Sequence, residues 1–429
     1  MKKLSNQTKN RVVICVFFIA LLLSQLVMII SAVASDGYSF HSLFYNYYAE
    51  SFMDFFNKFD GSLIKNPYNA MEIGSYSIAS PLSMLVFKFA TNFAKNEIYD
   101  MDKSYLPHFS ETLLIYFVFS IIVIVAISIL LFNKKKGKTL TKVGFLYLVL
   151  FSAPFLINYE RGNIIILSLL FLLLYIFNYD SETTYVRHLS YVALALSVTI
   201  KPLTVVFAIL IFKKKRVKEG FLSLLYSLVL WIIPAFFYNG FDTIVSIFKN
   251  IPDVFKQVSE GIAYKVDIFS GINAISMTLG YGNVNSTVKY VIGGILIAAL
   301  FACVILSKSV WRQALALSMI VISGSVFDRQ ASLVLLVIPL LFLLDSDKER
   351  KAMDVVYTLL ITFIFAPLAI KDCILNFSAN EGAEIYLYSY IALISSTIIT
   401  ILLFLETVTL PLAGIELTNK EQASKDKCF

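Results

Sequence analysis

The run VVICVFFIALLLSQLVMIISAVA occupies residues 12–34 and contains no charged side chain. About 20 apolar residues are enough for a helix to cross the hydrocarbon core of a bilayer. Similar runs recur along the 429-residue chain, which is 58% hydrophobic and only 15% charged. Soluble proteins are about half apolar and about a quarter charged. The sequence therefore predicts an all-α, polytopic transmembrane bundle rather than two or three soluble domains.

Apolar runs and their charged borders predict about twelve spans, some of them short or re-entrant. After the first, they cover residues 112–132, 143–158, 164–178, 189–200, 203–212, 221–238, 288–306, 314–326, 331–344, 355–370 and 385–405. Pro202 separates two short runs and favours a broken or re-entrant pair there, because proline interrupts a helix. We expect a membrane-embedded body over residues 1–412 and a cytoplasmic tail over residues 413–429.

Lysine and arginine cluster beside the spans, for example at residues 134–136 and 213–216. Cytoplasmic loops carry such an excess of positive charge. Both termini are therefore expected in the cytoplasm, and the long loops 35–110 and 239–286 outside the membrane. The net charge of +7 follows from this topology, so no nucleic-acid partner is expected. Ala32-Val33-Ala34 resembles a signal-peptide cleavage site, but the preceding run is longer than a signal core, which favours a retained span.

The sequence lacks the motifs of common cofactor and metal sites. Its three histidines and four cysteines are scattered, and no phosphate-binding glycine loop, dinucleotide fingerprint or zinc helix is present. We therefore expect no cofactor and no metal site. Asp36 and Asp54 leave divalent-metal binding as an alternative, since hard cations prefer oxygen ligands.

Ionisable side chains recur at or near the predicted outer ends of the spans. They are Asp36, Asp54, Glu160, Arg161, Lys201, Asp328 and Arg329. Such groups are costly at membrane depth and are functional candidates, although each alone is equally well explained as a solvated helix end. A carboxylate can act as a general base toward a hydroxyl, and cations can hold a phosphate leaving group. Together they suit glycosyl transfer from a lipid-linked sugar phosphate.

The first long loop carries a series of short motifs. In order they are Asp54 among aromatic residues, Asn66-Pro67-Tyr68, Tyr76 and Pro81-Leu82. This order resembles the GT-C membrane glycosyltransferases and, more closely, the mannosyltransferase-like proteins of bacterial glycosyltransferase family 87. The turn Arg161-Gly162-Asn163 and the pair Lys201-Pro202 resemble later features of that family. The chain departs from the family pattern at Ser80, where a proline is expected, and at Asn66.

The resemblance implies an inverting transfer of a hexose, such as mannose, from a polyprenyl-phosphate donor on the extracytoplasmic face. The acceptor would be a hydroxyl of a cell-envelope glycan or glycolipid. Asp54 would be the catalytic base, with Asp36 as its rival because it follows the first span closely. The donor phosphate would bind Arg161, Lys201 and Arg329, and the supporting residues would be Glu160, Asn163, Tyr76 and Asp328.

Two other classes of membrane protein fit parts of this pattern. Polysaccharide polymerases and ligases also have about a dozen spans and outer arginines, but their large loop comes late in the chain. Transporters and flippases have internal repeats and ionisable residues in mid-span, and this sequence has no clear example of either. The early position of the long loop favours the glycosyltransferase.

Overall fold

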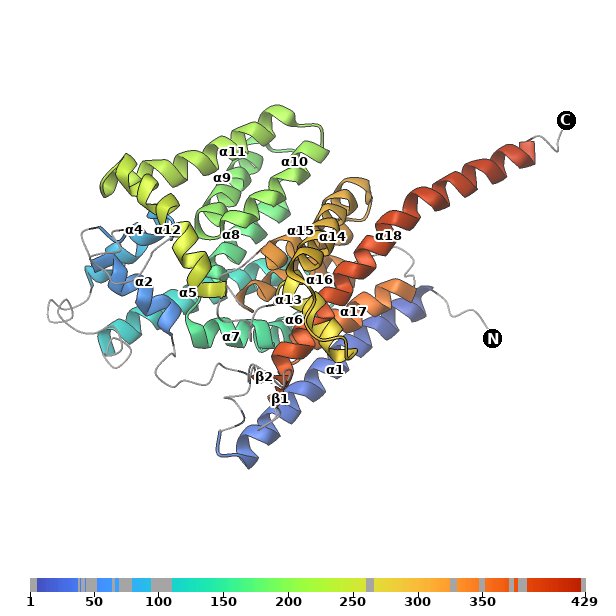
Figure 1. Cartoon of the computed structure of the whole chain (residues 1–429), viewed down its shortest axis with the longest axis horizontal. Coiled ribbons are helices and arrows are strands. Elements are labelled where there is room, and N and C mark those ends of the chain that lie inside the picture. Colours follow the sequence, from blue (N-terminus) through green and yellow to red (C-terminus); the bar gives the residue numbers. More distant parts are fainter. Residues whose placement is uncertain are drawn as a thin grey trace.

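The computed structural model describes residues 6–37, 39, 43, 52–63, 66–68, 79–93, 110–259, 266–324, 330–346, 352–369, 374–376 and 384–425. These residues are almost entirely helical (Figure 1). Two short strands, β1 (Ile374–Asn376) and β2 (Glu384–Tyr386), pair antiparallel as a small exception. The predicted all-α class is confirmed apart from this ladder.

The helices follow the chain in a simple order. They are α1 (Asn6–Ala34), α2 (Met53–Leu63), α4 (Pro81–Thr91), α5 (Ser110–Lys134), α6 (Thr139–Leu150), α7 (Ala153–Arg161), α8 (Ile165–Asn178), α9 (Thr184–Ile200), η5 (Pro202–Ala208), α10 (Ile209–Lys213), α11 (Val217–Ile232), η6 (Ile233–Phe237), α12 (Phe241–Ser259), α13 (Ile268–Thr278), α14 (Ser286–Leu306), α15 (Val310–Gly324), η8 (Ala331–Leu336), α16 (Val337–Leu344), α17 (Ala352–Phe365) and α18 (Leu387–Lys425). Helix α18 continues beyond residue 412, so the predicted body and tail do not separate at a helix end.

Five helical segments of the described chain are long and apolar enough to cross a membrane, or six if one bent pair counts as a single span. They are Val12–Ala34, Ser110–Lys134, Val217–Phe237, Ser286–Leu306 and Leu387–Thr409, called the candidate spans below. The multi-pass membrane protein is thus confirmed, but the count of twelve spans is not. Several of the other predicted spans fall on apolar helices of only 10–17 residues, too short for the roughly 20 residues that a full crossing needs.

One predicted span is interrupted, and a second break lies between two predicted spans. Helices α6 and α7 meet at an angle of 52°, with Pro154 in the first turn of α7. A proline fits the first turn of a helix but not its interior, which explains why the helix restarts there. Helix α9 likewise ends at Lys201-Pro202, and the chain goes on as the 3₁₀ helix η5. The broken geometry predicted around Pro202 is present.

The helices differ in how much of their surface is buried. In α15 and α16 nearly every described side chain is buried, whereas α1, α5 and α14 expose large hydrophobic residues along their lengths. A helix that is apolar all round lies in the interior or faces lipid. Helices α15 and α16 therefore belong to the centre of the bundle, and the exposed faces of α1, α5 and α14 are suited to contact with lipid.

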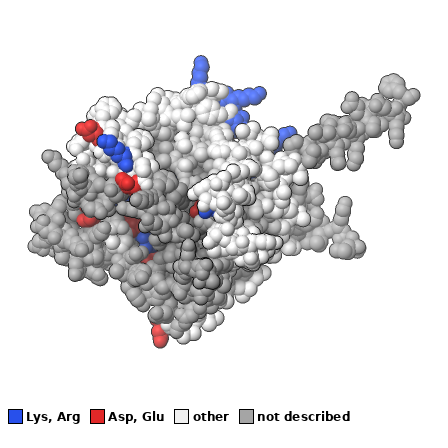
Figure 2. Space-filling model, in the orientation of Figure 1, with Lys and Arg blue, Asp and Glu red and all other residues white. Residues whose placement is uncertain are grey.

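Charged side chains are unevenly spread over the described surface. Most of the described surface in Figure 2 is uncharged, and lysine and arginine side chains stand out along its upper edge, where α10 and α11 lie in Figure 1. Helix α9 packs against both α8 and α11. With 17 residues at about 1.5 Å each, α9 is about 26 Å long, shorter than the roughly 30 Å of a bilayer core. Its two ends carry the two polar clusters described next.

Candidate active site

Asp54 lies in the first turn of α2, and both of its carboxylate oxygens accept a hydrogen bond from the turn between α7 and α8. Arg161 Nη2 donates to Oδ1 over 2.9 Å, and Asn163 Nδ2 donates to Oδ2 over 2.8 Å. The side chains of Asp54 and Arg161 keep 24% and 18% of their surface exposed. The carboxylate is therefore held in a fixed orientation but remains within reach of solvent.

Close backbone contact brings α2 to this turn. Gly162 ends α7 with a left-handed backbone (φ 65°), and a Cβ atom placed there would lie 2.9 Å from Phe55 Cβ. Glycine is the residue that allows both the conformation and the approach. The backbone N–H of Phe52 donates to the carbonyl of Glu160 over 2.6 Å. Phe52 itself has a positive φ of 63°, which is uncommon for an aromatic residue and occurs where the surroundings enforce it.

The aromatic residues after Asp54 form a small core. Phe55, Phe56 and Phe59 are buried, and they pack with Phe87 of α4 and Tyr116 of α5. The Tyr116 hydroxyl donates to the carbonyl of Tyr159 at the end of α7. These rings therefore fix α2 against its neighbours. They are not placed as a stacking surface for a sugar.

A small cavity of about 50 Å³ is lined by Asn163, the residue that also donates to Asp54. Its wall combines two cations with the amino-terminal end of α4, and its lining residues are Lys58, Ala79, Ser80, Ser83, Asn163, Ile164, Ile165, Ile200 and Lys201. This cavity is called the cationic pocket below. Lys58 follows Asp54 by one helical turn, so both side chains extend from the same face of α2.

The two lysines of the cationic pocket lie outside the candidate spans, and each is destabilised as a cation. Burial lowers the pKa of Lys58, an effect that Asp54 partly opposes. Burial also lowers the pKa of Lys201 to about 7, and the charge of Lys58 adds to this shift. Two cations forced together in a partly dry pocket favour an anionic ligand, which would relieve their repulsion.

The first turn of α4 adds two serine hydroxyl groups to the same wall. Ser80 Oγ accepts a bond from the backbone N–H of Ser83 over 3.1 Å, and the two hydroxyl oxygens lie 2.9 Å apart. Helix amino termini carry partial positive charge and bind phosphate groups readily. The lysines, hydroxyls and helix end together form a pocket suited to phosphate.

A second, apolar cavity of about 170 Å³ adjoins the cationic pocket. Ser83, Ile164 and Ile200 line both. The rest of its lining comes from α2, α4, α5, α8 and α9, and includes Phe55, Val86, Phe87, Phe119, Leu167 and Leu196. A polar pocket next to an apolar one suits an amphiphile with an anionic head.

The structure brings together four of the residues singled out in the sequence. Asp54, Arg161 and Asn163 are in direct contact, and Asn163 and Lys201 line the cationic pocket. Glu160 contributes its backbone carbonyl to Phe52. Arg161, predicted as a phosphate ligand, is paired with Asp54 in this structure, and its predicted role stays a prediction.

Among the described residues, Asp36 does not join this group. Asp36 lies in a turn two residues beyond α1, and that end of α1 is well separated from α2 in Figure 1. Tyr76, Asp328 and Arg329 lie outside the described residues. Lys58 was missed by the sequence reasoning, although its spacing of four residues from Asp54 on one helix is a signal for it.

The described residues contain no group of three or more His, Cys, Asp or Glu side chains that could hold a metal ion. The expectation of no cofactor and no metal site, with divalent-metal binding as its alternative, therefore stays a prediction from the sequence.

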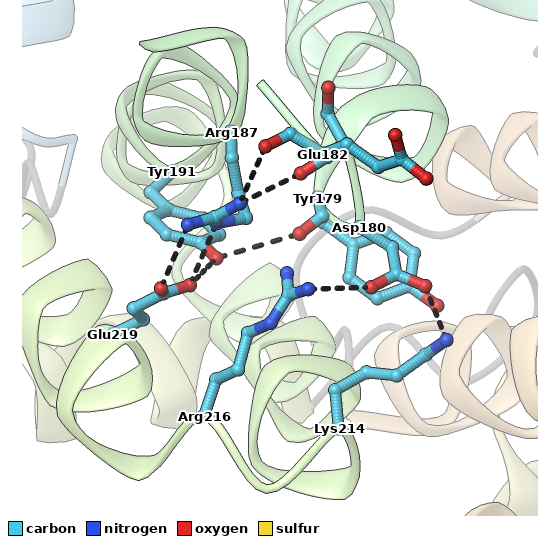
Figure 3. Close-up of polar contacts among 9 residues, drawn as sticks. Tyr179, Asp180, Glu182, Arg187, Tyr191, Lys214, Arg216 and Glu219 are labelled. Carbon is cyan, nitrogen blue, oxygen red and sulfur yellow. Dashed lines mark hydrogen bonds and ion pairs between the residues drawn. The ribbon is translucent and has the colours of Figure 1, made fainter. Parts of the chain in front are cut away.

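A second polar cluster lies at the opposite end of α9 (Figure 3). Glu219 accepts two hydrogen bonds from Arg187, over 3.1 Å from Nε and 3.2 Å from Nη2. Asp180 pairs with Lys214 and, over 3.3 Å, with Arg216 Nη2. Each of these three cations thus has a carboxylate partner, and the pairs join the α8–α9 loop and the start of α9 to the α10–α11 turn and the start of α11.

The arrangement can be compared with known protein families. The family model described as Glycosyltransferase family 87 matches residues 81–346, more than half of the chain. The matched segment includes Arg161, Asn163 and Lys201 and begins after Asp54 and Lys58. No curated protein and no solved structure matched the chain. The family match and the apolar helices lead to one conclusion: the chain belongs to glycosyltransferase family 87 and is a membrane-embedded glycosyltransferase.

Proposed function

We propose that this protein transfers a hexose from a polyprenyl-phosphate donor to a hydroxyl of a cell-envelope glycan or glycolipid, with inversion at the anomeric carbon. The proposal rests on residues that link Asp54, the cationic pocket and the apolar cavity. Asn163 lines the cationic pocket and also donates to Asp54, while Ser83, Ile164 and Ile200 connect that pocket to the apolar cavity. Base, phosphate site and lipid site are therefore neighbours.

The donor would be held at two points. Its phosphate binds Lys58, Lys201 and the first turn of α4, since ammonium groups and helix amino termini both favour phosphate. The first isoprene units of its lipid occupy the apolar cavity of about 170 Å³. This assignment replaces the predicted phosphate contact of Arg161, whose guanidinium is engaged by Asp54.

The reaction follows from the same positions. Asp54 takes the proton of the acceptor hydroxyl as its oxygen attacks the anomeric carbon from the side opposite the phosphate. The bond between that carbon and the phosphate oxygen breaks, and its electron pair leaves with the polyprenyl phosphate. Lys58 and Lys201 stabilise the negative charge that develops on the leaving phosphate. Arg161 and Asn163 keep the carboxylate oriented and act as positioning residues.

The distribution of charge supports an extracytoplasmic reaction. The basic residues Arg187, Lys214 and Arg216 cluster at one end of α9, and the cationic pocket lies at the other. The positive-inside rule assigns the first end to the cytoplasm, together with both chain termini. The pocket then faces the outer side, where lipid-linked sugars meet envelope acceptors.

The test uses full-length protein reconstituted with labelled polyprenyl-phosphate hexoses, mannose first, and a cell-envelope acceptor. Asp54→Asn should lower kcat by about 10²–10⁴-fold, the contribution expected of a general base. Asp36→Asn is the matched carboxylate control and should stay within about threefold of the wild type, because it is distant from the pocket. Full activity of Asp54→Asn together with loss of activity in Asp36→Asn would reverse the assignment. Full activity of both variants would contradict the proposed mechanism.

A further inference from the structure

The exposed face of α12 is divided into an apolar stripe and a polar stripe. Phe241, Val245 and Phe248 are 67%, 47% and 61% exposed and follow one another at helical spacing. Asp242 and Lys249 are also exposed, and at 100° per residue they lie together beside the apolar stripe. Exposed apolar residues on a water-soluble surface would normally be scattered, so a continuous stripe marks a contact surface.

The apolar stripe continues the exposed apolar surface of a candidate span. It begins directly after the candidate span Val217–Phe237, whose last residues Phe236 and Phe237 are exposed. The ring of Phe236 lies 5.3 Å from that of Phe241, between ring centroids. The ring of Trp231, inside the span, lies 5.9 Å from that of Phe248. The lipid that covers the end of the span therefore extends naturally over the stripe.

We propose that α12 lies along the surface of the bilayer as an interfacial helix, with Phe241, Val245 and Phe248 inserted among the lipid chains and Asp242 and Lys249 directed to water. Helices with separate apolar and polar faces bind membranes in this orientation. The partner is the lipid surface itself. The placement is independent of the chemistry proposed for the cationic pocket.

The buried face of α12 connects this surface to the active-site region. Asn250 Nδ2 donates to the carbonyl of Tyr68 over 3.2 Å, and Ile247 packs in one cluster with Tyr68 and Met84. Met84 belongs to the first turns of α4, whose amino-terminal end forms a wall of the cationic pocket. An interfacial α12 therefore fixes the level of that pocket relative to the bilayer surface, where a lipid-linked ligand would have its phosphate.

The experiment compares two neighbouring positions in full-length protein in phosphatidylcholine nanodiscs. Trp231 and Trp311, the two tryptophans of the chain, are first replaced by phenylalanine. Single tryptophans are then introduced as Phe248→Trp and Lys249→Trp, with Ile121→Trp in α5 and Lys138→Trp in the adjoining loop as lipid-facing and water-facing controls. Brominated lipid should remove about half or more of the emission at positions 248 and 121. Positions 249 and 138 should keep the red-shifted emission of a water-exposed ring.

The proposal is overturned if positions 248 and 249 behave alike. Quenching at both would place α12 inside the hydrocarbon, and quenching at neither would place its apolar stripe in water or under protein. Where a tryptophan-free variant fails to fold, the same comparison is made with an environment-sensitive thiol label. The label is attached to the variants Phe248→Cys and Lys249→Cys after the four native cysteines have been replaced by serine.

Discussion

The two ends of helix α9 carry charge in different ways. At its first end, Arg187 is bound by Glu219, while Lys214 and Arg216 share Asp180 (Figure 3). At its last end, Lys201 lines a small pocket with a second cation, Lys58. Paired charges hold two loops together without any ligand. Two lysines that line one cavity favour a bound anion, so the second end is the place to look for a substrate.

Near the cationic pocket, the largest loss of rate after that of Asp54→Asn is expected from Arg161→Met. The variant releases one oxygen of Asp54 and lets the base move, and misplacement of a catalytic group by about 1 Å costs about 100-fold in rate. Steady-state kinetics should show the loss in kcat, with the donor KM nearly unchanged. A large rise in donor KM with kcat preserved would instead make Arg161 a phosphate ligand, as the sequence alone predicted. Arg161→Lys should recover part of the rate, because it retains a cation.

A smaller effect is expected from Lys201→Met. A hydrogen bond to a charged group contributes about 1.5–3 kcal/mol, so the donor KM should rise about 10- to 100-fold. Arg187→Met is the matched control at the other end of α9. It should lower the thermal midpoint, because it leaves Glu219 without its main partner, and leave the donor KM unchanged. Equal changes of KM in the two variants would remove the distinction between the ends of α9.

The smallest effect is expected when the pH is raised. The pKa of Lys201 is lowered to about 7 in the ligand-free protein, so the cation is lost as pH rises through that value. The sugar phosphodiester stays anionic over this range. The ratio kcat/KM for the donor should therefore fall by up to roughly tenfold between pH 7 and pH 9, while kcat changes less because bound phosphate favours the charged lysine. Lys201→Arg should flatten the profile, since arginine stays protonated. A wild-type profile that does not change over this range would exclude the predicted role of the Lys201 charge.

The sequence predicted the class of fold and much of the site for clear physical reasons. Long apolar runs such as residues 12–34 and the break at Pro202 act locally, so the corresponding helix and helix end could be read directly. The motif residues Asp54 and Lys201 were identified by resemblance and by the rarity of charge near spans. The number of spans could not be derived, because short apolar helices such as α16 are buried in the bundle and have the same composition as lipid-facing ones.

The partners of each charge were beyond sequence reasoning. Arg161 and Asp54 are 107 residues apart, and their contact depends on the turn at Gly162 and the close approach of Phe55. Lys58 was not singled out from the sequence, and it is the packing of α2 that places it in one pocket with Lys201. This packing decides which cations line the pocket and which one contacts Asp54.

The most direct test of the contrast between the two ends of α9 is equilibrium binding of a short-chain polyprenyl phosphate to the full-length protein in detergent or nanodiscs. The double variant Lys58→Met/Lys201→Met should bind at least about 100-fold more weakly than wild type, because two charged contacts are lost. The double variant Arg187→Met/Arg216→Met should bind as the wild type does. Unchanged binding in the Lys58/Lys201 variant, or a loss confined to the Arg187/Arg216 variant, would contradict the assignment of the cationic pocket as the phosphate site.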